Sequence, residues 1–276
     1  MNRRFLLIGL ASVLIILFGF FLTVVITNQH SEAVKEKARK AKIESIANLA
    51  KEARELQEKG SFLEAQSLYQ SLINDYPNST EASDWQRELE GLNIKLLFSP
   101  ILTAKSELYE IKPGDTLVKI AKDYNTTTEL IMRSNNLSED KIFPRRKIKV
   151  WTAPFTLLAD KSQNTLILKS GEEIIKTYIV STGINNSTPS GNFKIVNKLT
   201  NPTWFKSGAV VAPNSPDNIL GSRWLGFNLA GYGIHGTSSP QDLGKQVTEG
   251  CLRMSNADVE ELFAIVPIGT EITIVD

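Results

Sequence analysis

The hydrophobic and polar positions divide the chain into stretches of different character, and the first is almost entirely apolar. Residues 5–27 read FLLIGLASVLIILFGFFLTVVIT and contain no charge. At about 1.5 Å per residue, a helix of this length crosses a hydrocarbon core of about 30 Å. The pattern therefore predicts that residues 1–30 form a cytoplasmic tail and a transmembrane anchor. The alternative, a cleaved signal peptide, has a shorter apolar core and a small-residue cleavage site, which is not evident here.

Positive charges lie on both sides of this apolar stretch, so the charge pattern gives no clear orientation. Arg3 and Arg4 precede it, and the polar segment at residues 28–42 adds five lysine and arginine residues after it. The cytoplasmic flank of a span is usually the more positive one. The short N-terminal tail still favours a C-terminal region on the outer side, and the ligands of that region have to decide the matter.

Residues 31–98 show the periodicity of α-helices. Apolar residues recur at helical spacing over residues 43–58 and 62–76, Gly60 separates the two runs, and Ser79 or Thr80 is a candidate cap for a third helix. This pattern resembles a single tetratricopeptide-type repeat. One repeat buries little core without neighbours. Two interpretations therefore remain open, a helical spacer and a groove that binds a protein partner through residues 43–95.

A β-α-α-β order follows over residues 107–151. Two strands are predicted at residues 109–112 and 147–151, with two helices between them. The first helix is expected to begin at Asp115 or Thr116, and the second at Thr127 or Thr128. This segment resembles a LysM module, although PRRK at 144–147 stands where that family usually has a Pro-Gly turn. The residues that carry the resemblance are Tyr109, PGDTL at 113–117, Ile120-Ala121, Tyr124, Leu130 and Asn135-Asn136-Leu137.

The LysM resemblance implies binding of glycans that contain N-acetylglucosamine, and hence of peptidoglycan. Asp115, Thr116 and Asn135 are the candidate glycan contacts. Helix capping and turn formation are the alternative roles of the same three side chains.

Residues 153–276 alternate between polar and apolar positions or are rich in β-branched residues, and turn residues interrupt the runs. This predicts a mainly-β domain with one helix at 256–265. The expected fold is thus multidomain: a transmembrane helix, an α-helical TPR-like segment, a small α+β module and a mainly-β domain. The predicted strands are 155–159, 165–169, 176–182, 192–196 and 271–275.

Composition and charge exclude several classes of function. The net charge is +1, which gives no electrostatic basis for nucleic-acid binding. One cysteine excludes an intramolecular disulfide, and with only two histidines it argues against a zinc site. We therefore expect no metal, no cofactor and no nucleic-acid partner.

The single cysteine, Cys251, lies sixteen residues after His235. A thiol has a pKa of about 8.5 and needs a base or a charge partner to react at neutral pH. Gly250 permits close approach of the backbone, as an oxyanion pocket requires. If the chain is extended there, Arg253 shares a face with Cys251. Spacing alone is more typical of an inert buried thiol than of a catalytic pair.

Residues 153–276 resemble the catalytic domain of the YkuD-type L,D-transpeptidases along nearly their whole length. The motifs appear in the expected order, although the family more often has Ser-His where this chain has Thr248-Glu249. They are STG at 181–183, TPSG at 188–191, Phe193, Trp204, LGF at 225–227, IHGT at 234–237, GCLRM at 250–254, Asn256, Asp258-Val259, Val266-Pro267 and Gly269-Thr270.

This resemblance implies a β-sandwich-like fold and cysteine peptidyl transfer. It matches Cys251 to the nucleophile, His235 to the general acid and base, and Gly236 to the residue whose carbonyl orients the imidazole. The loop at Gly250 would supply the oxyanion site through the N–H of Cys251 and a neighbouring amide. Arg253 would bind a substrate carboxylate or pair locally. Trp204 and Tyr232 are further candidates for substrate binding.

The function expected from this resemblance is a membrane-anchored peptidoglycan L,D-transpeptidase that forms cross-links through a thioester on Cys251. The alternative is an anchored wall-binding protein whose β domain is either catalytically silent or hydrolytic, as an L,D-carboxypeptidase. Glu249 keeps the silent alternative open, because a carboxylate near the thiol opposes thiolate formation. A helical scaffold that recruits a wall-synthesis protein can coexist with either function.

These expectations also set the localisation. Both C-terminal modules would need cell-wall substrate, so they are expected outside the membrane. The protein would then be a single-pass protein of the bacterial cell envelope, held to the membrane through residues 5–27.

Overall fold

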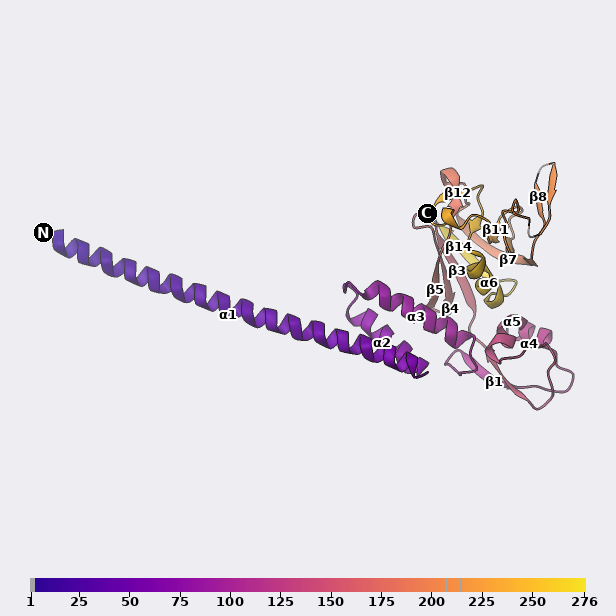
Figure 1. Ribbon diagram of the computed structural model, residues 1–276, viewed down its shortest axis with the longest axis horizontal. Coiled ribbons are helices and arrows are strands. Elements are labelled where there is room, and N and C mark those ends of the chain that lie inside the picture. The colour runs from indigo at the N-terminus through magenta and orange to yellow at the C-terminus, as the bar shows by residue number, and fades with distance from the viewer. Residues whose placement is uncertain (1–2, 207, 214) are drawn as a thin grey trace. The chain divides into compact units, whose positions relative to one another are not determined.

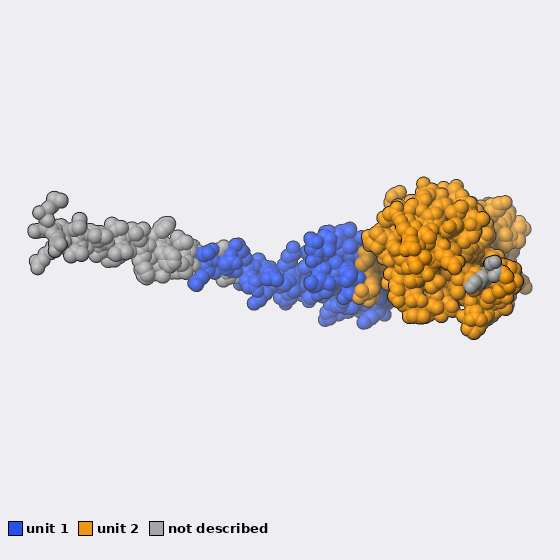
Figure 2. Space-filling view, turned by 90° about the horizontal axis from the view of Figure 1, so that it is seen from above, with its two compact units in different colours: residues 1–85 blue, residues 86–276 orange. Residues whose placement is uncertain are grey.

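The structure is a computed structural model, and it describes most of the chain. The backbone is described for residues 3–206, 208–213 and 215–276, and the side chains for residues 28–29, 32, 34–205, 208–213 and 215–276. The chain forms two compact units, residues 1–85 and residues 86–276 (Figure 2).

The first unit is helical, as the sequence predicts. It contains α1 (Arg3–Glu58) and α2 (Phe62–Asp75), and the polar segment at 28–42 is part of α1. The last turns of α1 pack against α2 around small side chains and one aromatic ring. The buried residues are Ala50, Ala53, Ala65, Tyr69 and Leu72.

The predicted anchor at residues 5–27 belongs to the part of α1 whose side chains are not described. Among the side chains that the structure describes, no helix combines the length and the apolar character that a membrane crossing needs. Residues 5–27 lie outside those described side chains, so the anchor stays a prediction.

The second unit begins within α3 (Ala82–Leu97) and continues into the predicted β-α-α-β module. Strand β1 (Ser106–Glu110) pairs antiparallel with β2 (Lys147–Trp151). Between them, Thr116 caps α4 (Leu117–Asp123) and Thr127 caps α5 (Thr128–Ser134), each by accepting a backbone N–H. The order of elements and both caps agree with the sequence prediction.

The rest of the second unit is built on an eight-stranded sheet, which confirms the mainly-β prediction (Figure 1). Its strand order is β13-β11-β10-β7-β14-β3-β4-β5, and the helix α6 (Asn256–Ile265) follows β13. In chain order the strands are β3 (Phe155–Asp160), β4 (Thr165–Ser170), β5 (Glu173–Ile179), β7 (Gly191–Thr200), β10 (Arg223–Phe227), β11 (Gly233–His235), β13 (Leu252–Arg253) and β14 (Glu271–Val275).

Two short pairs of strands and two 3₁₀ turns complete this domain. The β6–β12 pair is parallel, and the β8–β9 pair is an antiparallel hairpin that extends from the domain (Figure 1). The elements are β6 (Thr182–Gly183), η1 (Ile184–Asn186), β8 (Trp204–Lys206), β9 (Ala209–Val211), η2 (Pro240–Asp242) and β12 (Gln246–Thr248).

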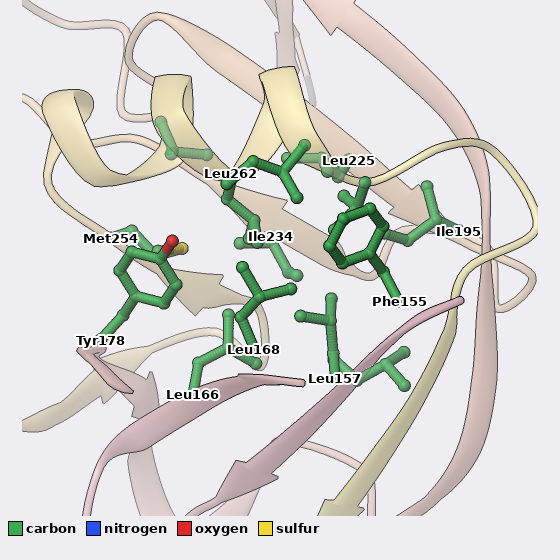
Figure 3. Packing of buried hydrophobic residues seen from close by; sticks show 14 of the residues in the cluster. Phe155, Leu157, Leu166, Leu168, Tyr178, Ile195, Leu225, Ile234, Met254 and Leu262 are labelled. Atoms are coloured by element: carbon green, nitrogen blue, oxygen red, sulfur yellow. The ribbon is translucent and has the colours of Figure 1, made fainter. Parts of the chain in front are cut away.

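One hydrophobic core joins the two ends of the sheet. Figure 3 shows Leu157 and Leu168 of β3 and β4 meeting Leu225 and Ile234 of β10 and β11, with Leu262 of α6 in the same cluster. Strands that are far apart in the sheet order share this core, so the sheet curves around it. The short strands β11 and β13 are thereby held by buried side chains on one face, and their other face is left for the site.

The β-α-α-β module and the mainly-β domain are joined by specific contacts within the second unit. The ring of Trp151 stacks on that of Phe155, with centroids 6.0 Å apart, and its Nε1 donates to Ser170 Oγ at 3.0 Å. The hydroxyl of Thr127 donates to the carbonyl of Ala264. Capping of α5 and attachment to α6 therefore use the same side chain.

Candidate active site

The register of three neighbouring strands places the candidate catalytic side chains on one face. Trp224 of β10 lies opposite His235 of β11, which lies opposite Arg253 of β13. Side chains alternate between the two faces of a strand. Ile234 and Leu252 face the core and are fully buried, so His235 and Arg253 point to the other face. Cys251 lies in the turn directly before β13 (Leu252–Arg253).

This face opens into a cavity of about 690 Å³. Cys251, His235 and Arg253 all line it, together with the predicted substrate-binding residues Trp204 and Tyr232. Trp204 and Arg253 are 49 residues apart in the sequence. The pairing of β10, β11 and β13 and the β8–β9 hairpin bring these residues to one cavity. The remaining lining residues are Leu199, Pro202, Thr203, Phe205, Ile219, Leu220, Trp224, Gly231, Val247, Thr248 and Glu249.

His235 is held in one tautomer by the backbone that follows it. Its Nδ1 lies 2.7 Å from the carbonyl oxygen of Gly236. A carbonyl can only accept, so Nδ1 carries the hydrogen and the lone pair of the neutral ring is on Nε2. The side chain is 2% exposed. Burial lowers the pKa of His235 to about 4, although the Gly236 carbonyl favours the charged form, so the imidazole is neutral at pH 7.

Trp224 fixes the plane of the His235 ring, and sequence reasoning missed this residue. The two rings stack with centroids 6.1 Å apart and planes inclined by 20°. The indole Nε1 of Trp224 donates to Asn197 Oδ1 at 3.0 Å, which holds the indole in turn. The sequence next to LGF did not reveal that Trp224 contacts His235, because the contact depends on the pairing of β10 with β11 across the connection at residues 228–232.

Cys251 is a protonated thiol at rest. Its Sγ donates to the carbonyl of Gly231 at 3.4 Å. Burial raises the pKa of Cys251, and the charge of Glu249 raises it further, while Arg253 acts in the opposite direction. Since the imidazole is neutral and the thiol is protonated, the pair does not rest as a thiolate and an imidazolium.

The turn that presents Cys251 depends on Gly250 and Thr248. Gly250 has φ +131°, and a Cβ there would lie 2.7 Å from Tyr232 Cε1. The Thr248 hydroxyl accepts from the N–H of Gly250 at 3.2 Å and donates to the carbonyl of Cys251 at 2.7 Å. The N–H of Gly250 is therefore already hydrogen-bonded to Thr248. The same hydroxyl also holds the carbonyl of Cys251, so it connects the residues before and after Gly250.

Asn256 plays a similar role for the segment after His235, and it too was missed as a site residue. Its Oδ1 accepts from the N–H groups of Ser222 and Thr237, both at 3.1 Å, and its Nδ2 donates to the carbonyl of Thr237 at 2.9 Å. A Cβ at Gly236 would lie 2.1 Å from this Oδ1. Glycine is thus required where the backbone carbonyl orients the imidazole.

Among the residues whose side chains the structure describes, Arg253 has no ion-pair partner. Its Nε is buried and makes no hydrogen bond, and within the described ranges no carboxylate lies at ion-pair distance from its guanidinium. Local ion pairing, one of its two expected roles, is therefore not seen among these residues. Its backbone instead bridges Ser181 through two hydrogen bonds of 2.8 and 2.9 Å.

The three candidate glycan contacts of the β-α-α-β module have internal hydrogen bonds. Asp115 accepts from the Tyr109 hydroxyl, from Lys112 N–H and from Lys119 Nζ. Thr116 caps α4. Asn135 bridges to Lys149 N–H and carbonyl at 2.7 and 2.8 Å. All three show the capping and turn-forming role that was their alternative, and glycan contact remains a prediction for them.

No group of three or more His, Cys, Asp and Glu side chains is arranged to hold a metal ion in the part of the chain with described coordinates.

Comparison with known proteins agrees with the arrangement of these modules. Residues 154–274 match the family model described as the L,D-transpeptidase catalytic domain, YkuD. Residues 109–151 match the LysM domain. Both ranges fall within the segments that the sequence motifs indicate.

Curated relatives match more than half of this chain. A protein of Bacillus licheniformis that bears the name L,D-transpeptidase YkuD is 35% identical over 175 residues, which cover 60% of this chain and 98% of that protein. The protein of the same name from Bacillus subtilis strain 168 is 35% identical over 173 residues, covering 60% and 97%.

A solved L,D-transpeptidase structure from Mycobacterium smegmatis aligns with a TM-score of 0.39 and 19% identity, over 48% of this chain and 63% of that one. On the family match and the near-complete coverage of its relatives, the chain belongs to the YkuD family of L,D-transpeptidases, with a LysM domain ahead of its catalytic domain.

Proposed function

We propose that this enzyme cross-links peptidoglycan stem peptides through a thioester on Cys251, with His235 as the general acid and base. The observation that supports the proposal is that both residues line one cavity, His235 from β11 and Cys251 from the turn directly before β13. Family membership supplies the reaction class, L,D-transpeptidation.

The first half-reaction starts from a neutral pair. Because Nδ1 of His235 donates to Gly236, the thiol proton passes to Nε2 as the sulfur attacks the carbonyl carbon of the donor's diamino acid at its L-centre. The C–N bond to terminal D-Ala breaks, and the imidazolium gives the proton to the leaving amine. A thioester remains on Cys251.

The second half-reaction releases the thioester. The side-chain amine of a second stem attacks the same carbonyl carbon and gives a proton to Nε2 of His235. A C–N bond forms, the C–S bond breaks, and His235 passes that proton to the sulfur. Water as the acceptor would give L,D-carboxypeptidase activity instead. The product therefore distinguishes the two activities, a cross-linked dimer from one and a tripeptide from the other.

The developing oxyanion needs N–H donors. Gly250 N–H donates to Thr248, so we assign the oxyanion to the N–H of Cys251 and a neighbouring amide, with Gly250 giving the backbone its conformation. Arg253 suits a carboxylate of the donor stem, because its guanidinium lines the cavity and has no carboxylate partner among the described residues. Trp204 and Tyr232 line the same cavity and suit the apolar parts of the stem.

The LysM domain suits a role in holding the enzyme on its polymeric substrate, since LysM and L,D-transpeptidase domains both imply peptidoglycan binding.

We further propose that residues 5–27 anchor the chain in the membrane and that the C-terminal domains lie outside it. A reporter fused after Asp276 tests this topology. A reporter that is active in the periplasm supports it, and a signal from a cytosol-active reporter alone contradicts it.

The helical unit offers a place for a protein partner. A cavity of about 500 Å³ is lined by Ile43 and Ile46 of α1 and by Tyr76 and Pro77 after α2. We propose a wall-synthesis protein as its ligand, against the simpler role of a spacer. Photo-crosslinking from residue 46 in cells distinguishes the two, because a spacer gives no discrete crosslinked band.

Incubation of the full-length protein with a purified stem tetrapeptide, followed by mass analysis, tests the proposed function. We expect free D-Ala and a cross-linked dimer, both lost in Cys251→Ala. If neither dimer nor tripeptide forms with the wild-type protein, the enzyme mechanism proposed here is wrong.

A further inference from the structure

Glu249 lies in the wall of the cavity. Its side chain is exposed, and within the described ranges it makes no hydrogen bond or ion pair. Its backbone is held on both sides by the Thr248 hydroxyl, which contacts Gly250 N–H and the Cys251 carbonyl. The hydrogen bonds of Thr248 thus hold the turn that carries Glu249, and its carboxylate is open to a ligand.

Glu249 and Arg253 give the cavity two charges of opposite sign, on either side of Cys251 in the sequence. Both line the cavity, and they do not form an ion pair with each other. A buried guanidinium N–H without an acceptor costs free energy that a bound anion would offset. Two unpaired charges in one cavity indicate a ligand that carries both signs, with an anionic group at Arg253 and a cationic group at Glu249.

The position of Glu249 is unfavourable for the first half-reaction. Its charge opposes ionisation of the Cys251 thiol. In the second half-reaction the sulfur is esterified and uncharged, so this cost is absent. The incoming group at that stage is an aliphatic amine with a pKa of about 10 in water, and it arrives as an ammonium ion.

We propose that Glu249 forms the acceptor subsite, where it binds the ammonium of the incoming amine and favours transfer to an amine over transfer to water. This inference rests on the transpeptidase function proposed above. One proton of the bound ammonium goes to solvent, the nitrogen forms a bond to the thioester carbonyl carbon, and the C–S bond breaks. A second proton passes through His235 to the departing sulfur.

The test compares the full-length wild-type protein with Glu249→Gln, using a stem tetrapeptide as both donor and acceptor. The ratio of dimer to tripeptide reports amine attack against attack by water. We expect this ratio to fall about three- to fivefold in Glu249→Gln at low salt, as is typical for one exposed ion pair, and the difference to shrink in 1 M salt. Over the same comparison, acylation by a carbapenem should become faster, because a negative charge near the thiol is removed.

Glu172→Gln is the matched control, since Glu172 is an exposed carboxylate in the β4–β5 turn and is not among the residues that line the cavity. It should leave the product ratio at the wild-type value. An unchanged ratio in Glu249→Gln, or an equal fall in Glu172→Gln, would overturn the subsite. If the wild-type protein forms no acyl-enzyme at all, the proposed function fails and the subsite fails with it. Wild-type acylation with an unchanged Glu249→Gln ratio rejects the subsite alone.

Discussion

The imidazole of His235 lies against the indole of Trp224, with ring centroids 6.1 Å apart and planes inclined by 20°. The contact covers one face of a ring whose opposite neighbour in the sheet is Arg253. It links the orientation of the catalytic base to its protonation, because the same indole that fixes the ring plane also keeps water from it.

Replacement of this indole should therefore change both properties of His235. In Trp224→Leu we expect the pKa of His235 to rise from about 4 towards its ordinary value of 6.5, because water reaches the ring. Acylation by a carbapenem should slow by about tenfold or more as the base loses its alignment. NMR titration of the histidine resonances measures the pKa, and a His30→Asn background leaves His235 as the one histidine. A pKa that stays near 4 would contradict the role given to Trp224.

The stability of the protein should fall on mild acidification because of His235. Between pH 6.5 and about 4 the unfolded chain binds a proton at this residue and the folded chain does not. The neutral His235 thus makes its full contribution to the free energy of unfolding above pH 6.5. This contribution, about 3 kcal/mol, is lost as the pH falls from 6.5 to about 4. Urea denaturation of the wild type and of His235→Asn at pH 7 and pH 4 measures it, and an equal pH dependence in both proteins would refute it.

The Thr248 hydroxyl should be needed for the conformation of the Gly250–Cys251 turn. Thr248→Val keeps the shape of the side chain and removes both hydrogen bonds. We expect a loss of about 1–3 kcal/mol in the free energy of unfolding and slower acylation of Cys251. Thr248→Ser is the control and should retain wild-type acylation, so a Ser variant as slow as the Val variant would show that the hydroxyl is not the cause.

Gly236 and Asn256 should be energetically coupled. Gly236→Ala places a Cβ against Asn256 Oδ1, and we expect it to cost about 1–3 kcal/mol of stability and to slow acylation. In an Asn256→Ala background the clash is absent, so the same substitution should cost less. A double-mutant cycle measured by thermal unfolding checks this, and strictly additive costs would show that the two residues do not meet.

The regular parts of the fold could be predicted from the sequence because their patterns are local. The alternation in β3 and β4, the 256–265 helix and the Thr116 and Thr127 caps all follow from neighbouring residues, and the structure contains each of them. Strands β10 and β11 were not predicted as strands. They are only five and three residues long and contain glycines, and burial against the distant β3 and β4 side chains defines them.

The site was predictable where family motifs carried it. Cys251, His235, Gly236 and Gly250 stood out by scarcity or by motif, and the cavity contains the first two. Trp224 and Asn256 act through hydrogen bonds and stacking across strands, which no spacing in one sequence reveals. The sequence likewise did not reveal whether Arg253 has an ion-pair partner, because that depends on which carboxylates the fold brings near its guanidinium.

The most direct test of the central claim is the intact mass of the full-length protein after incubation with a carbapenem. The account predicts a single covalent adduct on the wild-type protein, no adduct on Cys251→Ala, and adduct formation slowed by about 10²-fold or more in His235→Ala. Since Cys251 is the only cysteine in the chain, the adduct site is unambiguous. An adduct that persists in Cys251→Ala, or wild-type rates in His235→Ala, would contradict the account.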